Sequence, residues 1–435
     1  MELRNSYDII VAGAGIAGIC AAVKAAREGA SALLIEHYAF LGGMSTAGMV
    51  SPFMKYSIDG RPLVGGIFEE IESAMRSLGG MIDNGFYAHA FRMASFQLLE
   101  SAGVHMLLLS DVASVERTGN EMISVTTLTG GYKKTIKGSY FIDTTGDAQL
   151  LYLANFPWVK GDEKTGLLQA LTLFFRMGGI DMPVMLDYVR NHQDDFLGWM
   201  TFDFDQDKII SVAGYHSFIK KGIAEGRLPK ELEYIFFTTL PQSGEGSFNT
   251  TNVLGLDGST SFDLTKAELM GREQTHSVVT LLQNEVPGFE KSYVIETAVQ
   301  IGVRETRRAV GDYVVTGEDV RSGRKFSDAI ARGCYGIDIH GQAGESSRLE
   351  DLPEGQYYDV PAASLIVRDA DNLLVAGRCL SATREAHSAL RIMATAAATG
   401  EACGAWAALS AKKKLPLRKI GIKDIQELVR HNISD

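Results

Sequence analysis

Residues 7–36 constrain the fold of this chain more than any other stretch. Residues 7–12 are rich in β-branched apolar side chains, which predicts a buried strand, and residues 31–35 predict a second strand that ends at Glu36. Between the two strands, residues 16–28 are alanine-rich with helical spacing. Three glycines stand at the first turn in the spacing G-x-G-x-x-G: Gly13, Gly15 and Gly18. The stretch therefore predicts a complete β-turn-α-β unit.

The three glycines predict a phosphate-binding turn, because each removes a different steric obstacle. Gly13 permits the tight turn, Gly15 lets a pyrophosphate approach the backbone, and Gly18 lets the helix pack closely on the strand. The first helical residues, Ile16 and Ala17, would present free N–H groups and a partial positive charge to that pyrophosphate. The carboxylate that closes the second strand is placed to accept hydrogen bonds from ribose hydroxyls. We therefore expect a dinucleotide site; the alternative is a glycine-rich turn without a ligand.

Length, composition and charge narrow the class of protein. At 435 residues the chain is too long for one ordinary core, so two intertwined domains are expected. The net charge of −11 argues against binding to nucleic acid or to an anionic membrane. No apolar run reaches the roughly 18 residues that span a bilayer. The first strand begins close to residue 1, so we expect no signal peptide and a cytoplasmic protein.

The four cysteines carry no recognisable motif. They are scattered along the chain, at Cys20, Cys334, Cys379 and Cys403. This spacing excludes a C-x-x-C redox pair and the ligand patterns of zinc and iron–sulfur sites. We expect free thiols in a reducing compartment and no metal site.

The residues that follow Glu36 resemble those of FAD-dependent oxidoreductases of the glutathione-reductase structural class. A second glycine pair comes soon after the acid, and the resemblance implies that the stretch contacts FAD through His37, Gly42, Gly43, Met44 and Ser45. His37 directly follows the ribose acid, on the wrong side of the cofactor for covalent attachment. The resemblance therefore implies non-covalent FAD as the cofactor.

Three later stretches carry the same resemblance. It implies cofactor contacts from Val112, from the turn Thr145-Gly146-Asp147, and from the closing motif with Gly377, Arg378, Arg391, Met393 and Ala394. In the family, a strand and a long helix return to the cofactor at this motif, and the helix N-terminus points at the flavin. The family often has proline near the start of that helix, where this chain has Ala394.

The rest of the chain predicts helices and strands around this cofactor unit. Residues 67–78 and 88–102 predict amphipathic helices, and the four strands expected between residues 104 and 137 predict an antiparallel meander. Residues 140–143 predict a strand that returns to the parallel sheet. Farther along, residues 264–286 predict one long helix.

The returning part of the chain is expected to alternate strands and loops before its final helix. Residues 299–315 predict a strand, a bend and another strand, and residues 379–390 predict a polar loop. Residues 391–411 predict an alanine-rich helix, in which Gly400 and Gly404 allow close packing.

These patterns predict an α/β fold: a Rossmann-like FAD-binding domain with a β-meander, interrupted by an inserted α+β substrate or cap domain. The expected segments are the first part of the FAD-binding domain, the substrate or cap domain, the return of the FAD-binding domain and a helical tail, at residues 1–150, 151–344, 345–411 and 412–435. A second glycine fingerprint is missing from the sequence, so a built-in NAD(P)H domain is not expected.

Two arginines of the string Arg-Glu-Thr-Arg-Arg at residues 304–308 are candidate substrate or cofactor ligands. Arg304 and Arg307 could present forked donors to a substrate carboxylate or to an FAD phosphate. The alternative is an ion-paired surface cluster with Glu305 and Asp312. The string also resembles the family's Arg-Glu-(Ser/Thr)-Arg-Arg segment.

His387 is the first candidate for acid–base chemistry, because it lies between Arg378 and the helix expected to face the flavin. An imidazole exchanges protons near neutral pH. The alternative is a histidine that merely bonds a loop carbonyl. Arg384 is expected to hold an anion or polarise a carbonyl, and His340 and Tyr358 are weaker acid–base candidates.

These observations predict an FAD-dependent oxidoreductase that transfers a hydride between flavin N5 and a small polar substrate. A carboxylate and a hydroxylated, sugar-like substrate both remain open, and the electron acceptor is unknown. Two other functions are open: a flavoprotein acting in RNA modification, which the acidic balance disfavours, and a non-catalytic FAD-binding protein.

Overall fold

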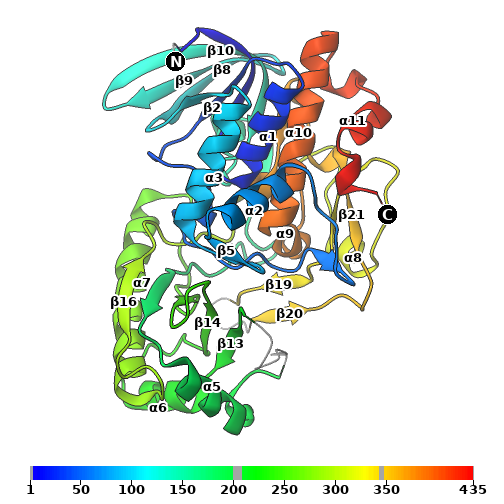
Figure 1. Ribbon diagram of the computed structural model, residues 1–435. Coiled ribbons are helices and arrows are strands. Elements are labelled where there is room, and N and C mark those ends of the chain that lie inside the picture. Colours follow the sequence, from blue (N-terminus) through cyan, green and yellow to red (C-terminus); the bar gives the residue numbers. More distant parts are fainter. Residues whose placement is uncertain (1–2, 199–207, 342–346, 435) are drawn as a thin grey trace.

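A seven-stranded sheet joins the beginning and the end of the chain (Figure 1). The computed structural model describes residues 3–198, 208–341 and 347–434. In this sheet β1 (Ser6–Ala12) is parallel to β2 (Ala32–Ile35) on one side and to β10 (Tyr132–Asp143) on the other. β22 (Leu373–Val375) also pairs in parallel with β10. The expected α/β class with a parallel, Rossmann-like sheet is therefore confirmed.

Two alanine-rich helices, α1 (Ile16–Arg27) and α10 (Met393–Lys413), pack side by side next to this sheet (Figure 1). Their contact is a backbone contact, because small residues face each other. A Cβ atom added at Gly400 or at Gly404 would strike a carbonyl oxygen of α1. The close packing expected at these two glycines is confirmed.

The antiparallel meander differs from the expected one at both ends. It is built from β8 (Asp111–Thr118), β9 (Glu121–Thr129) and the first half of β10. β7 (His105–Leu107), predicted as its first strand, is instead parallel to β2. The reason is that the chain reaches β7 from α3 (Ala88–Ser101), and a helical crossover brings a strand back in parallel. β10 also runs without a break into the parallel sheet.

A second sheet, of five antiparallel strands, lies at the lower end of the view in Figure 1. Its strands, in spatial order, are β13 (Ser211–Gly214), β14 (Ile235–Thr239), β15 (Gly246–Phe248), β12 (Phe175–Gly178) and β16 (Tyr293–Thr297). Aromatic side chains fill its core, among them Phe237, Phe248 and Phe289. The predicted long helix is confirmed as α7 (Ser261–Glu285), with Thr260 as its N-cap.

Shorter elements complete the chain. The remaining helices are α2 (Ile67–Ser77), α4 (Gln149–Leu153), α5 (Met182–Asn191), α6 (His216–Ala224), α8 (Gly317–Arg321), α9 (Arg384–Leu390) and α11 (Ile422–Leu428). The remaining strands form pairs: β3 (Ser57–Ile58) with β4 (Arg61–Pro62), β5 (Met81–Ile82) with β6 (Gly85–Phe86), β11 (Trp158–Lys160) with β17 (Arg307–Ala309), β18 (Ala329–Gly333) with β21 (Tyr358–Pro361), and β19 (Ile337–Ile339) with β20 (Arg348–Glu350).

The polar loop predicted at residues 379–390 is wrong. A short turn is followed there by helix α9, whose N-cap Thr383 accepts a hydrogen bond from the N–H of Ala386. Ala386, Ala389 and Leu390 are fully buried in the main core. Small apolar residues between the polar ones thus let the segment turn into a buried helix.

Of the strand, bend and strand predicted within residues 299–315, only one strand, β17, forms. The side chains of two arginines in this stretch also reach distant backbone carbonyls. Arg304 donates to the carbonyl oxygen of Ala170, and Arg308 donates to that of Ala382. These long side-chain contacts hold the segment in an irregular path.

No helix in the described part of the chain is long and apolar enough to cross a membrane. The predicted domain boundaries stay predictions, and the boundary between residues 344 and 345 lies outside the described residues.

We predict that Gly400→Ala weakens the fold although alanine is the better helix former. The helix propensity of alanine favours the variant by about 1 kcal/mol. The new methyl group, however, meets the α1 backbone, and such overpacking lowers the free energy of unfolding by about 1–3 kcal/mol. Urea denaturation of the FAD-loaded proteins measures the change.

Gly421→Ala is the matched control, because its Cβ would lie 3.7 Å from the nearest carboxylate oxygen of Asp424, an ordinary contact. Gly421 is the N-cap of α11, where glycine is preferred to alanine, so the free energy of unfolding of this variant should fall by only roughly 0.5 kcal/mol. A Gly400→Ala variant as stable as the Gly421→Ala variant would contradict the backbone contact.

Candidate active site

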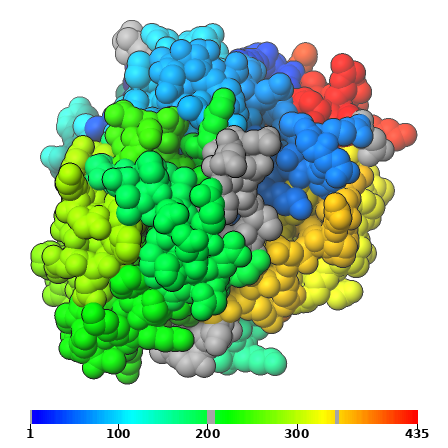
Figure 2. Space-filling view, turned by 60° about the horizontal axis from the view of Figure 1, so that its bottom comes forward, coloured from blue at the N-terminus to red at the C-terminus, as the bar shows by residue number. Residues whose placement is uncertain are grey.

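One large cavity, of about 840 Å³, lies where the carboxyl ends of the parallel strands face the second sheet. Its walls include residues at the ends of β1, β2 and β10 on one side and residues of β14 on the other. Residues next to and within β19 and β20 close a third side. Figure 2 shows the green surface of the second sheet beside the yellow-to-orange surface of the returning part of the chain. The carboxyl ends of parallel strands are where α/β folds bind ligands.

The fingerprint glycines shape the floor of this cavity. Gly13 has a φ of 93°, and a Cβ there would lie 2.6 Å from the carbonyl oxygen of Thr144. At Gly15, by contrast, a Cβ would meet no described heavy atom within 4 Å beyond its chain neighbours, so it would project into open space. A Cβ at Gly18 would strike the carbonyl oxygen of Gly13. The turn is thus tight on the protein side and open on the cavity side.

Glu36 and the second glycine pair hold the fingerprint turn in place. Oε2 of Glu36 accepts a hydrogen bond of 2.6 Å from the N–H of Ala14, and Oε1 accepts one of 2.9 Å from Tyr38. The N–H of Gly42 donates to the carbonyl oxygen of Ala14 at 2.8 Å. A Cβ at Gly43 would lie only 2.9 Å from the Cα of Gly15. The two glycine turns therefore pack against each other, and the carboxylate of Glu36, which is expected to bind ribose hydroxyls, lies beside them.

The cavity fits an elongated dinucleotide. The first turns of α1 and α10 both reach its wall, and the start of α10 has no side-chain cap on its free N–H groups. Uncapped N–H groups and the helix dipole favour negative charge at these two places. The predicted cofactor residues that line the cavity are Gly13, Gly15, Ile16, Ala17, Glu36, His37, Gly42, Gly43, Met44, Ser45, Val112, Thr145, Gly146, Asp147, Gly377, Arg378, Arg391 and Met393.

Two predicted cofactor residues, Gly18 and Ala394, are not among the described residues that line the cavity. Both are buried in helices, Gly18 against the turn and Ala394 in the main core. Their part would be to let the backbone pack rather than to touch a ligand.

His387 lies outside the cavity among the described residues. Its ring is fully buried, and Nε2 lies 3.0 Å from the carbonyl oxygen of Arg378. Burial, followed by the charge of Arg308, holds the pKa of His387 well below 6.5, so the ring is neutral and Nε2–H donates to that carbonyl. The geometry is that of a histidine bonded to a backbone carbonyl.

Arg384 and Arg307 are also absent from the described cavity wall. Arg384 is buried, with Nε 3.5 Å from Oε2 of Glu305, which also pairs with Arg308. Arg307 donates to the carbonyl oxygen of Asp147 and packs its guanidinium 4.1 Å from the ring centre of Tyr152. Arg304 is the one candidate of this group that lines the cavity.

Tyr358, the other weak candidate, is buried away from the described cavity wall. Its hydroxyl donates a hydrogen bond to the backbone carbonyl oxygen of Tyr335 at 3.1 Å, which is a structural role.

His340 and Asp338 form an acid–base pair on the cavity wall. Nε2 of His340 lies 3.4 Å from Oδ2 of Asp338. The same oxygen accepts a hydrogen bond of 3.0 Å from the hydroxyl of Tyr335 and lies 3.5 Å from Nη2 of Arg391. The Asp338 carboxylate thus contacts three side chains that line the cavity.

The charges around this pair set its protonation. Burial opposes ionisation of Asp338, but His340 and Arg391 outweigh burial and hold the pKa of Asp338 well below its ordinary value. Burial, followed by the charge of Arg304, lowers the pKa of His340 below 6.5. At neutral pH the pair is therefore a carboxylate and a neutral imidazole. With Nε2–H directed to the carboxylate, Nδ1 keeps the lone pair.

Sequence reasoning ranked His340 low and missed Asp338, Tyr335 and Tyr234, although all four line the cavity. A signal was available for two of them. Asp338 and His340 are two residues apart in the extended chain of β19, and residues i and i+2 of a strand share one face. For Tyr335 and Tyr234 no local pattern marks a site, because distant segments bring them together.

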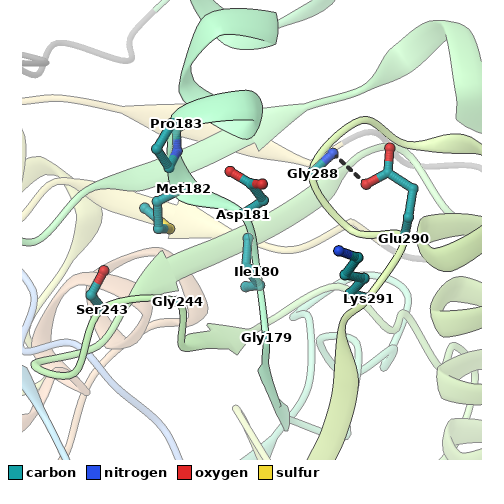
Figure 3. Close-up of a pocket in the computed structure, with 10 residues that line it drawn as sticks. All are labelled: Gly179, Ile180, Asp181, Met182, Pro183, Ser243, Gly244, Gly288, Glu290 and Lys291. Atoms are coloured by element: carbon teal, nitrogen blue, oxygen red, sulfur yellow. Dashed lines mark hydrogen bonds between the residues drawn. The ribbon is translucent and has the colours of Figure 1, made fainter.

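A second hollow, shown in Figure 3, lies at the start of α5. Asp181 caps that helix by accepting from the N–H of Val184, and Glu290 accepts from the N–H of Gly288 at 3.0 Å. The ten described residues that line this hollow do not line the large cavity. Asp181 and Glu290 thus serve a helix start and a turn.

Among residues 3–198, 208–341 and 347–434, no group of His, Cys, Asp and Glu side chains could hold a metal ion. The four cysteines are free and buried. The described wall of the cavity offers guanidinium, imidazole, carboxylate and phenol groups.

Comparison with known proteins gives one family. The family model described as FAD dependent oxidoreductase matches residues 8–429. No protein of curated function matches the sequence.

Solved structures resemble the chain only distantly. A geranylgeranyl bacteriochlorophyll reductase-like protein from Thermoplasma acidophilum has 13% identity and a TM-score of 0.48, covering 98% of this chain and 83% of its own. A flavoprotein/dehydrogenase from Cytophaga hutchinsonii has 13% identity and a TM-score of 0.46, with 97% and 83% covered. The p-nitrophenol 4-monooxygenase from Pseudomonas putida has 10% identity and a TM-score of 0.48, with 99% and 85% covered.

We predict that Gly15→Val yields a folded but colourless protein. The valine side chain would occupy the open space where the pyrophosphate of FAD is expected, while the described neighbours leave room for it in the apoprotein. The flavin absorption of the purified variant measures FAD content, and thermal unfolding compares it with wild-type apoprotein. A variant that retains full FAD would show that the pyrophosphate lies elsewhere.

Proposed function

The chain belongs to the FAD-dependent oxidoreductase family, and from this premise we propose that it transfers a hydride between a small polar substrate and flavin N5. Membership confirms the expected cofactor and the expected class of enzyme, whereas the narrower glutathione-reductase class stays a prediction. The observation that carries the proposal is that one cavity is lined both by the glycine fingerprint and by the His340–Asp338 pair.

The residues that would hold FAD are those of the two glycine turns, Glu36 and the first turn of α10. They fit it because the backbone at Gly15 faces open space and because two helix N-termini meet the cavity. When bound, FAD supplies the two-electron acceptor for the reaction. The protein's own task is then to hold the substrate and to move one proton.

His340 is placed to move that proton. Oxidation of an alcohol releases the hydroxyl proton as well as a hydride, and the neutral Nδ1 of His340 would accept the proton. Asp338 holds the ring through Nε2 and stabilises the imidazolium that forms, as a carboxylate does beside a catalytic histidine. In the opposite direction, the same imidazolium would return the proton to a substrate carbonyl oxygen.

Tyr335 and Arg391 both contact Asp338. The hydroxyl of Tyr335 donates to Oδ2 of Asp338, while Nη2 of Arg391 donates to the backbone carbonyl of Asp338 and lies 3.5 Å from Oδ2. They are therefore proposed as positioning residues, which fix the base without supplying or accepting the proton.

We predict that His340→Gln keeps FAD bound and slows flavin reduction. Loss of a general base typically costs about 10²- to 10⁴-fold in rate. Anaerobic stopped-flow mixing with the metabolite that reduces the wild-type flavin measures the rate. His192→Gln is the control, because His192 is exposed, bonds the carbonyl oxygen of Tyr188 and is absent from the described wall of the cavity. An unchanged rate in His340→Gln would remove His340 from the proposal.

We also predict that the rate of flavin reduction falls in acid with a midpoint below pH 6.5. The active form is neutral His340, so the rate is lost as pH falls through a pKa that burial and Arg304 hold low. Asp338 raises this pKa, so Asp338→Asn should move the midpoint to still lower pH while slowing the reaction. The test is the rate of flavin reduction measured across acidic pH. A midpoint at or above pH 6.5 would contradict the assignment of His340 as the base. A midpoint that Asp338→Asn does not shift would contradict it as well.

A further inference from the structure

Four arginines line the cavity, and they differ in how their charge is balanced. Arg378 lies 3.0 Å from Asp147, Arg348 lies 3.0 Å from Glu350, and Arg391 lies 3.5 Å from Asp338. Arg304 has no carboxylate partner within ion-pair distance in the part of the chain that the structure describes. It is therefore the arginine of this wall whose charge is left uncompensated.

Neutral oxygens hold Arg304 in place. Nη1 donates to the carbonyl oxygen of Ala170 at 2.8 Å and to Oγ1 of Thr172 at 2.5 Å. Nη2 donates to Oδ1 of Asn249 at 3.2 Å. These contacts orient the guanidinium without neutralising it. A guanidinium has five N–H donors, so Nε–H and one Nη2–H remain without a described acceptor.

The surroundings make this free charge costly. Burial, followed by the nearby charge of Arg391, lowers the pKa of Arg304 to about 10. Asp338 is the carboxylate whose charge acts on Arg304, but it is already shared by His340, Tyr335 and Arg391. A negative group on a ligand would relieve both the burial cost and the repulsion between two cations. The two free donors on neighbouring nitrogens match the two oxygens of a carboxylate.

We infer that Arg304 binds a carboxylate group of the substrate, so that the substrate is a small hydroxylated carboxylic acid. The hydroxyl part of this inference rests on the proposed function of the same cavity, and the carboxylate part rests on Arg304 alone. Arg304 holds one end of the molecule, and His340 takes the proton from the hydroxyl.

Binding of unreactive ligands tests the inference apart from catalysis. The FAD-loaded protein is titrated with acetate and with its neutral twin, acetamide, at fixed ionic strength, and the flavin absorption spectrum reports binding. We expect acetate to bind roughly 10- to 100-fold more tightly, because a hydrogen bond to a charged group adds about that much. Arg304→Gln should lower the affinity for acetate by a similar factor and leave that for acetamide unchanged.

Two further variants separate charge from structure. Arg304→Lys keeps the charge but loses the fork, so part of the affinity for acetate should remain. Arg176→Gln is the matched control: Arg176 has a side chain 17% exposed, lies 3.0 Å from Glu296 and is absent from the described wall of the cavity. It should bind acetate like the wild type. All variants are compared at equal FAD occupancy.

Several outcomes would overturn the inference. Acetate and acetamide of equal affinity in the wild type would do so, and this comparison holds even if Arg304→Gln does not fold. Unchanged acetate binding in Arg304→Gln would also overturn the inference. Saturable binding of inorganic phosphate without binding of acetate would overturn it too. If neutral polyols reduce the flavin and acetate does not bind, the inferred carboxylate group of the substrate would be wrong, but the proposed hydride transfer would stand. Acetate binding without flavin reduction by any metabolite would instead overturn the proposed hydride transfer.

Discussion

The backbone contact between α1 and α10 is the constraint on which the site depends. Glycines in α10 let the two helices approach until their backbones touch. Because both helices begin at the edge of the same sheet, this contact brings two helix N-termini to one cavity. Each N-terminus favours negative charge, and the distance between them is fixed by packing rather than by flexible side chains. A rigid pair of positive ends suits a long anionic cofactor.

Beyond the cofactor region, the site is governed by how its carboxylates are shared among its cations. Asp338 serves three neighbours at once, and this leaves Arg304 to be held by neutral oxygens only. Burial lowers the pKa of His340 most, and the positive charge of Arg304 lowers it further, so the ring stays neutral. Substrate binding and proton transfer thus depend on one electrostatic balance: an anionic substrate would lessen the repulsion that holds the histidine neutral.

The sequence allowed the cofactor half of the site to be predicted, because its signals are local. Gly13, Gly15 and Gly18 act within one turn, and their spacing alone carries the geometry. In the substrate half Arg304 was named from the sequence, but His340 was ranked below His387 for the opposite reason. His387 lies near the expected flavin-facing helix in sequence, yet α9 turns its ring into the core. His340 reaches the cavity from a short strand pair whose position depends on contacts with distant segments.

The pairing of α1 with α10 also has a consequence for how the protein is made on the ribosome. β1 and α1 leave the exit tunnel well before β22 and α10, which lie on the far side of the second sheet in the chain. Until then α1 has no partner for its buried alanine face, and the phosphate-binding turn lacks half of its surroundings. Contacts between such distant segments form slowly, because a long loop must close first. The complete flavin site can therefore form only after α10 has emerged and packed on α1.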